Sequence, residues 1–253
     1  MALEALIFDV DGTMADTEEG HRCAFNLAFE RLHLGWNWER GEYLGLLRVT
    51  GGKERLAHFI SQLDVSGAER QRLASRIPDI HREKTRFYSS MAGDGGIPLR
   101  PGVARLIGEA REAGLRLAIA STTTRANIDA LLRATLGAGG TAMFAAIACG
   151  DEAPAKKPAP DIYALALRRL ERPAEVCIAF EDSTNGLRAA SGAGLWSVVT
   201  PTQWTEGSDF VNAGLLLPHL GDPDQPIPHE PGHLLRDAAW LTLPELRTRF
   251  EHA

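Results

Sequence analysis

A short apolar segment near the start of the chain, residues 3–8, runs directly into the sequence Asp9-Val10-Asp11-Gly12-Thr13. Asp9 and Asp11 project to the same side only while the backbone stays extended, and Gly12 then allows a sharp turn at the carboxyl end of the strand. In an open parallel sheet, this end of a strand is the usual place for a functional site. A strand that ends in an Asx-type turn would give the same pattern without any function, so the pattern gains weight only if other segments supply matching chemistry.

Three later segments supply such chemistry, each at the end of a predicted strand or the start of a predicted helix. A second apolar strand ends in the hydroxyl of Ser121, Lys157 precedes a helix that two prolines delay, and a third apolar strand runs into Glu181-Asp182. Taken singly, Ser121 could cap a helix, Lys157 could be a solvated surface charge, and the acidic pair could mark the start of a helix. Four such segments in one chain are hard to assemble by accident.

In order and spacing, these four segments resemble the four motifs of the haloacid dehalogenase superfamily. The resemblance implies that Asp9 attacks phosphorus to give an aspartyl-phosphate, and that Asp11 protonates the leaving alkoxide and later accepts a proton from water. It also implies that Ser121 and the backbone N–H of Thr122 hold the phosphoryl group. Lys157 would then pair with Asp9 and with the phosphoryl oxygens.

The same chemistry requires a divalent cation, because a phosphate dianion repels an incoming carboxylate. Mg²⁺ fits this requirement as a hard ion that prefers oxygen ligands. By resemblance, its ligands are the carboxylates of Asp9 and Asp182 and the backbone carbonyl of Asp11. Glu181 is either a further ligand or a residue that contacts these ligands without contacting the metal. Asp11 also favours cleavage of C–O–P bonds, since the dehalogenase and phosphonatase branches lack an acid at this position.

The composition limits the possible partners. With 253 residues, 44% of them hydrophobic, the chain can bury a large core and carry one domain plus an inserted module. A net charge of -6 without a basic stripe disfavours nucleic-acid binding. The three cysteines are scattered, and no apolar run approaches membrane-spanning length. We therefore expect a cytoplasmic monomer that binds neither nucleic acid nor membrane, and the resemblance implies a small sugar phosphate as its partner.

The predicted elements indicate an α/β fold, a doubly wound parallel sheet of the Rossmann-like type, because strands and helices alternate in one compact chain. Residues 1–14 and 99–253 are predicted to form this core, and residues 15–98, which show helical periodicity, to form a small inserted cap. After the first strand, we expect core strands at 115–121, 145–149, 176–181, 195–199 and 215–217, and core helices at 103–113, 125–136, 161–170 and 184–192. Cap helices are expected at 21–32, 44–47, 56–63, 73–80 and 80–91. The segment 218–232 is expected to be a surface loop, because it is rich in proline, glycine and aspartate.

Three stretches of the cap, 16–26, 50–55 and 80–85, narrow the resemblance. They are similar to the CbbY family of the beta-phosphoglucomutase-like branch, whose members hydrolyse xylulose 1,5-bisphosphate, an inhibitor of Rubisco. The resemblance implies substrate contacts from the cap by Glu18, His21, Thr50, Gly51, Gly52, Lys53, Arg55 and Lys84. Among these, Lys53 beside two glycine N–H donors would hold the phosphate that does not react, with Arg55 as a second candidate.

Other interpretations stay open. Lys53 and Arg55 could equally belong to a solvated helix start, and His21 could be a packing residue. Thr13, at a position where sugar phosphomutases often carry an apolar residue, favours a phosphatase. A sugar phosphomutase is the alternative enzyme, and a non-catalytic, ligand-binding member of the fold is the alternative from another class.

Overall fold

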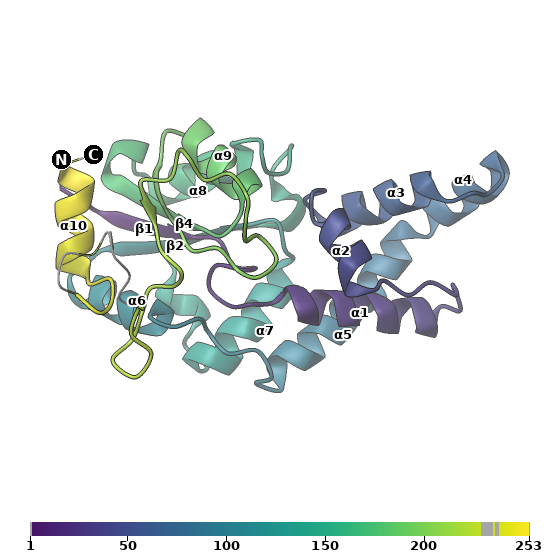
Figure 1. Cartoon of the computed structure of the whole chain (residues 1–253), viewed down its shortest axis with the longest axis horizontal. Coiled ribbons are helices and arrows are strands. Elements are labelled where there is room, and N and C mark those ends of the chain that lie inside the picture. The colour runs from purple at the N-terminus through teal and green to yellow at the C-terminus, as the bar shows by residue number, and fades with distance from the viewer. Residues whose placement is uncertain (1, 229–234, 236–237, 253) are drawn as a thin grey trace.

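The computed structural model describes residues 2–228, 235 and 238–252. At its centre lies a sheet of six parallel strands in the order β3-β2-β1-β4-β5-β6, with helices on both faces (Figure 1). The predicted doubly wound parallel sheet is therefore confirmed. The strands are β1 (Ala5–Phe8), β2 (Arg116–Ser121), β3 (Ala146–Cys149), β4 (Cys177–Glu181), β5 (Trp196–Val199) and β6 (Leu215–Leu216).

The central strand β1 contributes to two hydrophobic clusters, because successive residues of a strand point to opposite faces of the sheet. Leu6 and Phe8 belong to one cluster, and Ala5 and Ile7 belong to the other. Both faces are thereby covered, as a parallel sheet requires. The first cluster includes residues of α6 (Val103–Glu112), α7 (Arg125–Leu136) and α10 (Leu243–Glu251), and the second includes residues of α8 (Asp161–Leu170) and α9 (Thr184–Gly192).

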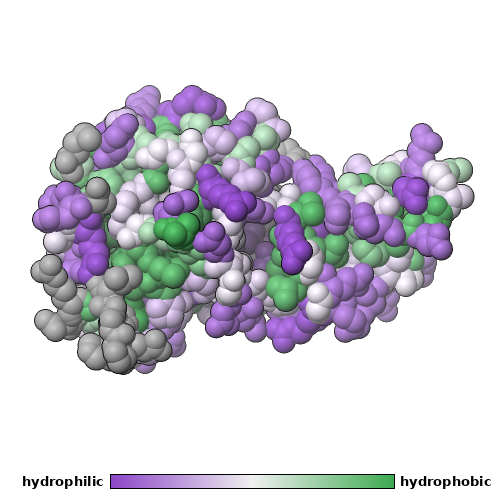
Figure 2. Space-filling model, turned by 45° about the horizontal axis from the view of Figure 1, so that its top comes forward, coloured by the Kyte–Doolittle hydropathy of each residue, from purple (hydrophilic) through white to green (hydrophobic). Residues whose placement is uncertain are grey.

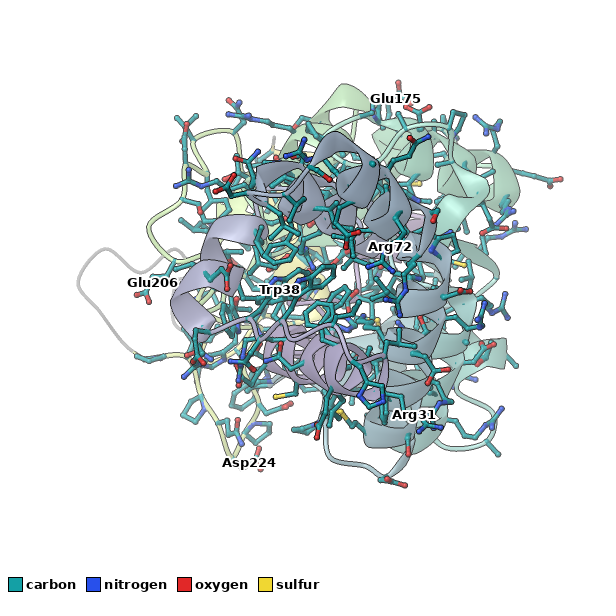
Figure 3. The ribbon with its side chains drawn as sticks, turned by 90° about the vertical axis from the view of Figure 1, so that its right-hand side faces the viewer. Arg31, Trp38, Arg72, Glu175, Glu206 and Asp224 are labelled. Carbon is teal, nitrogen blue, oxygen red and sulfur yellow. The ribbon has the colours of Figure 1, made fainter. Side chains whose placement is uncertain are left out.

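Five helices between β1 and α6 extend away from the sheet (Figure 1). An aromatic cluster fills the space between them, and Trp38 lies at its centre, surrounded by these helices (Figure 3). The two segments that connect them to the sheet meet at an antiparallel bridge between Ala15 and Leu99. The helices are α1 (Glu18–Arg31), α2 (Arg40–Leu46), α3 (Gly52–Gln62), α4 (Gly67–Ser75) and α5 (Ile77–Gly93).

The predicted helix boundary at residue 80 is wrong. Helix α4 ends at Ser75 and α5 begins at Ile77, so the expected helix 73–80 does not exist as one piece. Pro78 explains the break, because proline lacks an N–H and would clash in a continuing helix but is tolerated in the first turn of a new one. The first three cap helices begin three or four residues earlier than predicted, because polar first-turn residues do not appear in an apolar repeat.

Helix α10 was not predicted at all, although its start is locally encoded. The Thr242 hydroxyl accepts a hydrogen bond from the backbone N–H of Glu245, and Pro244 lies in the first turn. In the part of the chain that the structure describes, no helix has both the length and the apolar character needed to cross a bilayer.

The predicted surface loop 218–232 is only partly a surface feature; its residues 229–232 lie outside the described residues. Residues 218–228 contain no helix or strand, as expected. However, Leu220 and Ile227 are buried in the core, and the Asp222 carboxylate accepts a hydrogen bond from the backbone N–H of Gly102 at 2.6 Å. The loop therefore covers the start of α6.

Gly102 provides a test of this packing. Its φ of +86° is unfavourable for other residues, and an added Cβ would lie 2.5 Å from the carbonyl oxygen of Gly221. We expect Gly102→Ala to lower the free energy of unfolding by about 2 to 4 kcal/mol, from backbone strain plus overpacking. Gly114→Ala is the matched control, since Gly114 has a φ of +76° but open space around its Cβ position.

The control should lose only the strain contribution, about 1 kcal/mol. Denaturant titration of the two variants and the wild type gives the comparison. Equal losses in the two variants would mean that the loop can move aside and does not fix the start of α6.

Candidate active site

The sequence motifs meet at the carboxyl edge of the sheet because β1 lies between β2 and β4. Asp9 follows β1, Ser121 is the last residue of β2, and Glu181 is the last residue of β4. Parallel neighbours end on the same side of a sheet, so these side chains come together although they are far apart in the sequence. Lys157 joins them from the segment that precedes α8.

A buried lysine links two of the acids. The Lys157 ammonium donates hydrogen bonds to Asp9 Oδ1 and Glu181 Oε1, both at 2.6 Å. Burial alone would lower the pKa of Lys157, but the charges of Asp9 and Glu181 raise it above its ordinary value, so the lysine stays charged. The Tyr163 hydroxyl donates a further hydrogen bond to Glu181 Oε1 at 2.5 Å. Glu181 is therefore engaged by two donors from the side of α8.

Asp182 is the acid without such a partner. Its carboxylate is buried, and none of the hydrogen bonds or ion pairs among the described residues involves it. Burial raises its pKa well above the ordinary value, and the neighbouring Asp9 and Glu181 add to this effect. An added Cβ on Gly12 would collide with this carboxylate, so the glycine turn closes around it.

One carboxylate oxygen from each of Asp9, Glu181 and Asp182 can be chosen so that all three lie within 4.8 Å of one another. Three buried acids with one lysine between them carry excess negative charge, which a divalent cation would neutralise. The donor set consists of oxygen atoms only, which suits a hard cation. The residues therefore fit a metal ion, with Asp182 as the least engaged ligand.

Asp11 is held by two residues of the cap region. Its Oδ1 accepts a hydrogen bond from the Thr17 hydroxyl at 2.7 Å and lies 2.8 Å from His21 Nε2. Lys84 Nζ lies 2.8 Å from the other ring nitrogen, His21 Nδ1. Because an ammonium can only donate, Nδ1 accepts and Nε2 carries the proton toward Asp11. Burial alone would raise the pKa of Asp11, but these donors hold it well below its usual range.

A cavity of about 720 Å³ opens over these residues, between the strand ends and the cap helices. In the space-filling view, a waist separates the part that contains the sheet from the part that contains the cap helices (Figure 2). Most of the predicted site residues line the cavity: Asp9, Asp11, Glu18, His21, Thr50, Gly51, Gly52, Arg55, Lys84, Thr122, Lys157 and Asp182.

Three predicted residues, Ser121, Glu181 and Lys53, are not among the described residues that line the cavity. Ser121 is buried beneath it and accepts a hydrogen bond from the backbone N–H of Thr123. Ser121 is also not the cap of the next helix, because Thr124 takes that role. Lys53 and Arg55 are two positions apart on α3, about 200° around the helix, so they face different sides, and it is Arg55 that faces the cavity.

The sequence did not single out several residues that organise the site. Tyr163 and Asn127 carry no motif signal, yet Asn127 donates to Thr123 Oγ1 and accepts from Ser89 of the cap region. Asn185 lies three residues after Asp182 of the acidic motif and donates to Thr50 Oγ1 at 3.0 Å, which ties α9 to the start of α3. The position of Asn185 near the acidic motif was the sequence evidence that could have indicated its place in the site.

Comparison with known proteins identifies the family of the chain. Residues 3–194 match the model of the haloacid dehalogenase-like hydrolases. Protein CbbY encoded on a plasmid of Cupriavidus necator is 52% identical over 97% of this chain and 96% of its own length. Protein CbbY of Rhodobacter capsulatus is 48% identical over 91% of this chain and all of its own length.

Among solved structures, a mutant of CbbY from Rhodobacter sphaeroides in complex with xylulose-(1,5)bisphosphate has a TM-score of 0.80. It is 48% identical and covers 86% of this chain and 94% of its own. The chain thus belongs to the haloacid dehalogenase-like hydrolase family, and it is a phosphatase of that family. The resemblance to CbbY proteins is confirmed as well.

The Lys84–His21–Asp11 chain predicts a pH effect. Burial lowers the pKa of Lys84 to about 8, so its positive charge is present below that pH and is lost as the pH rises through it. We expect kcat/KM to fall with a midpoint near pH 8, because Asp11 and a bound phosphate then lose a nearby cation. Lys84→Gln should be roughly tenfold to a hundredfold less active at pH 7 and should lack this fall.

Lys84→Arg is the control, since arginine keeps its charge beyond pH 12. Its pH profile should stay flat where that of the wild type declines. A decline with the same midpoint in Lys84→Gln would assign the titration to another group.

Proposed function

We propose that this protein is a Mg²⁺-dependent sugar-bisphosphate phosphatase that acts on xylulose 1,5-bisphosphate through an aspartyl-phosphate on Asp9. The observation that carries the proposal is the buried Lys157–Asp9 pair beside the unpartnered Asp182, at the floor of a cavity with cations on its cap side. The similarity to CbbY, including a structure described as a complex with xylulose-(1,5)bisphosphate, supports the choice of substrate.

Asp9 is the nucleophile in this proposal. The Lys157 ammonium at 2.6 Å keeps the Asp9 carboxylate in place and neutralises part of the charge that would repel a phosphate dianion. Asp9 forms a bond to phosphorus as the bond to the leaving oxygen breaks, and water later hydrolyses the acyl phosphate. The backbone at Thr122, on the cavity wall after β2, would hold the phosphoryl oxygens, and Ser121 beneath it would support this loop.

Asp11 handles the proton. Its two hydrogen bonds use Oδ1, so Oδ2 is the oxygen that would give a proton to the leaving alkoxide and take one from water. The donors around Asp11 favour its ionised form, so the acid form must be produced when substrate binds. A phosphate dianion beside the carboxylate would raise its pKa, because like charges disfavour ionisation.

Mg²⁺ would be held by the carboxylates of Asp9 and Asp182 and by the backbone carbonyl of Asp11, with Glu181 kept behind them by Lys157 and Tyr163. When bound, it would neutralise the phosphate and the acid cluster and polarise the phosphoryl group. Residues 15–98 would form a cap that closes over the sugar and excludes water.

The cap would also hold the second phosphate. Arg55 is the stronger candidate for this contact, since it lines the cavity together with Gly51 and Gly52. Arg55 is fixed by its hydrogen bonds to Tyr43 and to the carbonyl of Leu46. The proposed role of Lys53 remains a prediction, and Glu18 and His21 lie where sugar hydroxyls would bind.

A panel of sugar mono- and bisphosphates, assayed with and without Mg²⁺, tests the proposal. Release of inorganic phosphate measures hydrolysis, and formation of an isomeric sugar phosphate would reveal the phosphomutase. The proposal expects the highest kcat/KM for xylulose 1,5-bisphosphate and loss of turnover after chelation of the metal. A higher kcat/KM for a monophosphate would contradict the bisphosphate assignment.

Replacing the nucleophile should stop turnover without unfolding the protein. Burial raises the pKa of Asp9 to about 7 and so disfavours its charge, and Asp9→Asn removes that charge at constant shape. We expect no detectable kcat and an unchanged or higher thermal midpoint in the absence of metal, measured by circular dichroism. Activity within about tenfold of wild type, a barrier change of only 1.4 kcal/mol, would exclude Asp9 as the nucleophile.

Replacing the acid should discriminate between leaving groups. Asp11→Asn should lower kcat/KM for a sugar phosphate about a hundredfold more than for an aryl phosphate, whose leaving oxygen needs no proton in the first step. Steady-state kinetics on both substrates gives the ratio. Equal losses would assign Asp11 a structural role beside Thr17 and His21.

A further inference from the structure

Trp204 connects the two parts of the molecule. It belongs to the loop after β5, residues 200–209, which lies on the core side of the cavity, yet its ring packs in the aromatic cluster of the cap helices. Only 8% of the residue is exposed. Its ring meets that of Tyr43 edge to face, with centroids 5.9 Å apart, and the Arg40 guanidinium lies 5.1 Å from the Trp204 ring centroid.

The loop that carries Trp204 is fixed to the core. Arg100 donates hydrogen bonds to the carbonyl oxygens of Thr200 and Pro201, at 2.5 and 2.8 Å. Within the loop, the backbone N–H of Trp204 donates to Thr202 Oγ1, and that of Thr202 donates to Thr205 Oγ1. Trp204 is therefore a core residue inserted into the cap and not a cap residue that happens to be distant in sequence.

The insertion has a cost that the ring contacts must offset. The Trp204 indole Nε1 is buried and has no hydrogen-bond partner among the described residues. A buried donor without a partner is destabilising, so this position favours the indole for the shape of its ring and its apolar contacts and not for its N–H. The edge-to-face contact with the Tyr43 ring is the stabilising interaction that offsets this loss.

Tyr43 in turn holds two charged residues of the cavity. Its hydroxyl donates to Glu18 Oε2 at 2.9 Å and accepts from Arg55 Nη1 at 3.0 Å. Glu18 and Arg55 both line the cavity, on α1 and α3. One hydroxyl therefore sets the distance between a carboxylate and a guanidinium that face the sugar region, and the Trp204 ring supports the phenol ring that carries it.

We propose that Trp204 is a positioning residue for substrate specificity: it holds the cap against the core and, through Tyr43, fixes Glu18 and Arg55 as a pair. Its effect is expected only on substrates that use these two groups, namely phosphorylated polyols large enough to reach them. An aryl phosphate, which fills only the floor of the site, needs them least. The inference rests on the proposed function in its choice of substrate and on the packing alone for its structural part.

The test uses Trp204→Phe and Trp204→Ala in the full chain with Mg²⁺. The ratio of kcat/KM for xylulose 1,5-bisphosphate to kcat/KM for 4-nitrophenyl phosphate should fall about fivefold to twentyfold in Trp204→Ala and less in Trp204→Phe. Amide hydrogen exchange, measured without substrate, should become faster in α2, which the ring contacts, and at the start of α3, which Arg55 ties to Tyr43. An unchanged substrate ratio would overturn the proposal, and so would unchanged exchange in α2.

Trp196→Ala is the matched control. Trp196 lies on β5, just before the same loop, and packs against Phe250 of α10, away from the cap. It should lower the thermal midpoint but leave the substrate ratio and the exchange of α2 unchanged. A ratio that falls equally in both tryptophan variants would show a general effect of instability and would overturn the specific role of Trp204.

The two proposals can fail separately. If the wild type does not hydrolyse xylulose 1,5-bisphosphate, the proposed substrate is wrong, and the best sugar phosphate of the panel replaces it in the ratio. Unchanged exchange in α2 of Trp204→Ala would then still reject the positioning role, whatever the substrate.

Discussion

The site depends on one buried contact, the Lys157 ammonium between Asp9 and Glu181. Three buried charged groups are stable only when each has hydrogen-bonding partners of suitable charge. Here one ammonium pairs with two carboxylates, and the Tyr163 hydroxyl donates a further hydrogen bond to Glu181. The strand order makes this possible, because β1 is flanked by β2 and β4 and their carboxyl ends coincide. This arrangement leaves Asp182 without a cationic partner among the described residues, and the three acids together fit a cation at this edge of the sheet.

Asp11, the proposed proton-transfer residue, is held from the other side of the cavity. Asp11 lies in the turn after β1, but its partners Thr17 and His21 lie before and on α1, and Lys84 lies on α5. The ionisation of Asp11 therefore depends on where the cap helices sit relative to the sheet. Asp9 and Asp11, the proposed nucleophile and acid, are two residues apart, and one is held by Lys157 of the core while the other is held by residues of the cap region.

The cap is joined to the core by more than its two connecting segments. Asn185 reaches Thr50, Asn127 accepts from Ser89, and Trp204 enters the aromatic cluster. Thr50, Asn127, Asn185 and Trp204 also line the cavity, so side chains that join the two parts form its walls as well. A substrate that contacts both parts would gain binding energy from an arrangement already favoured by packing.

The sequence alone was sufficient for the fold class and for the sheet edge at which the motif residues meet. Each of these follows from local information: an apolar run predicts a buried strand, and a polar residue at its end is near the site in any parallel sheet. Local information could not decide which side of α3 faces the cavity, and so could not choose between Lys53 and Arg55. It also could not assign His21 and Lys84 to Asp11, or find Tyr163 and Trp204, because an aromatic residue in a helix or loop has the same local pattern wherever its ring is buried. Only the tertiary structure brings segments that are distant in sequence into contact, and the partner of a side chain is decided there because packing and hydrogen bonding act through space and not along the chain.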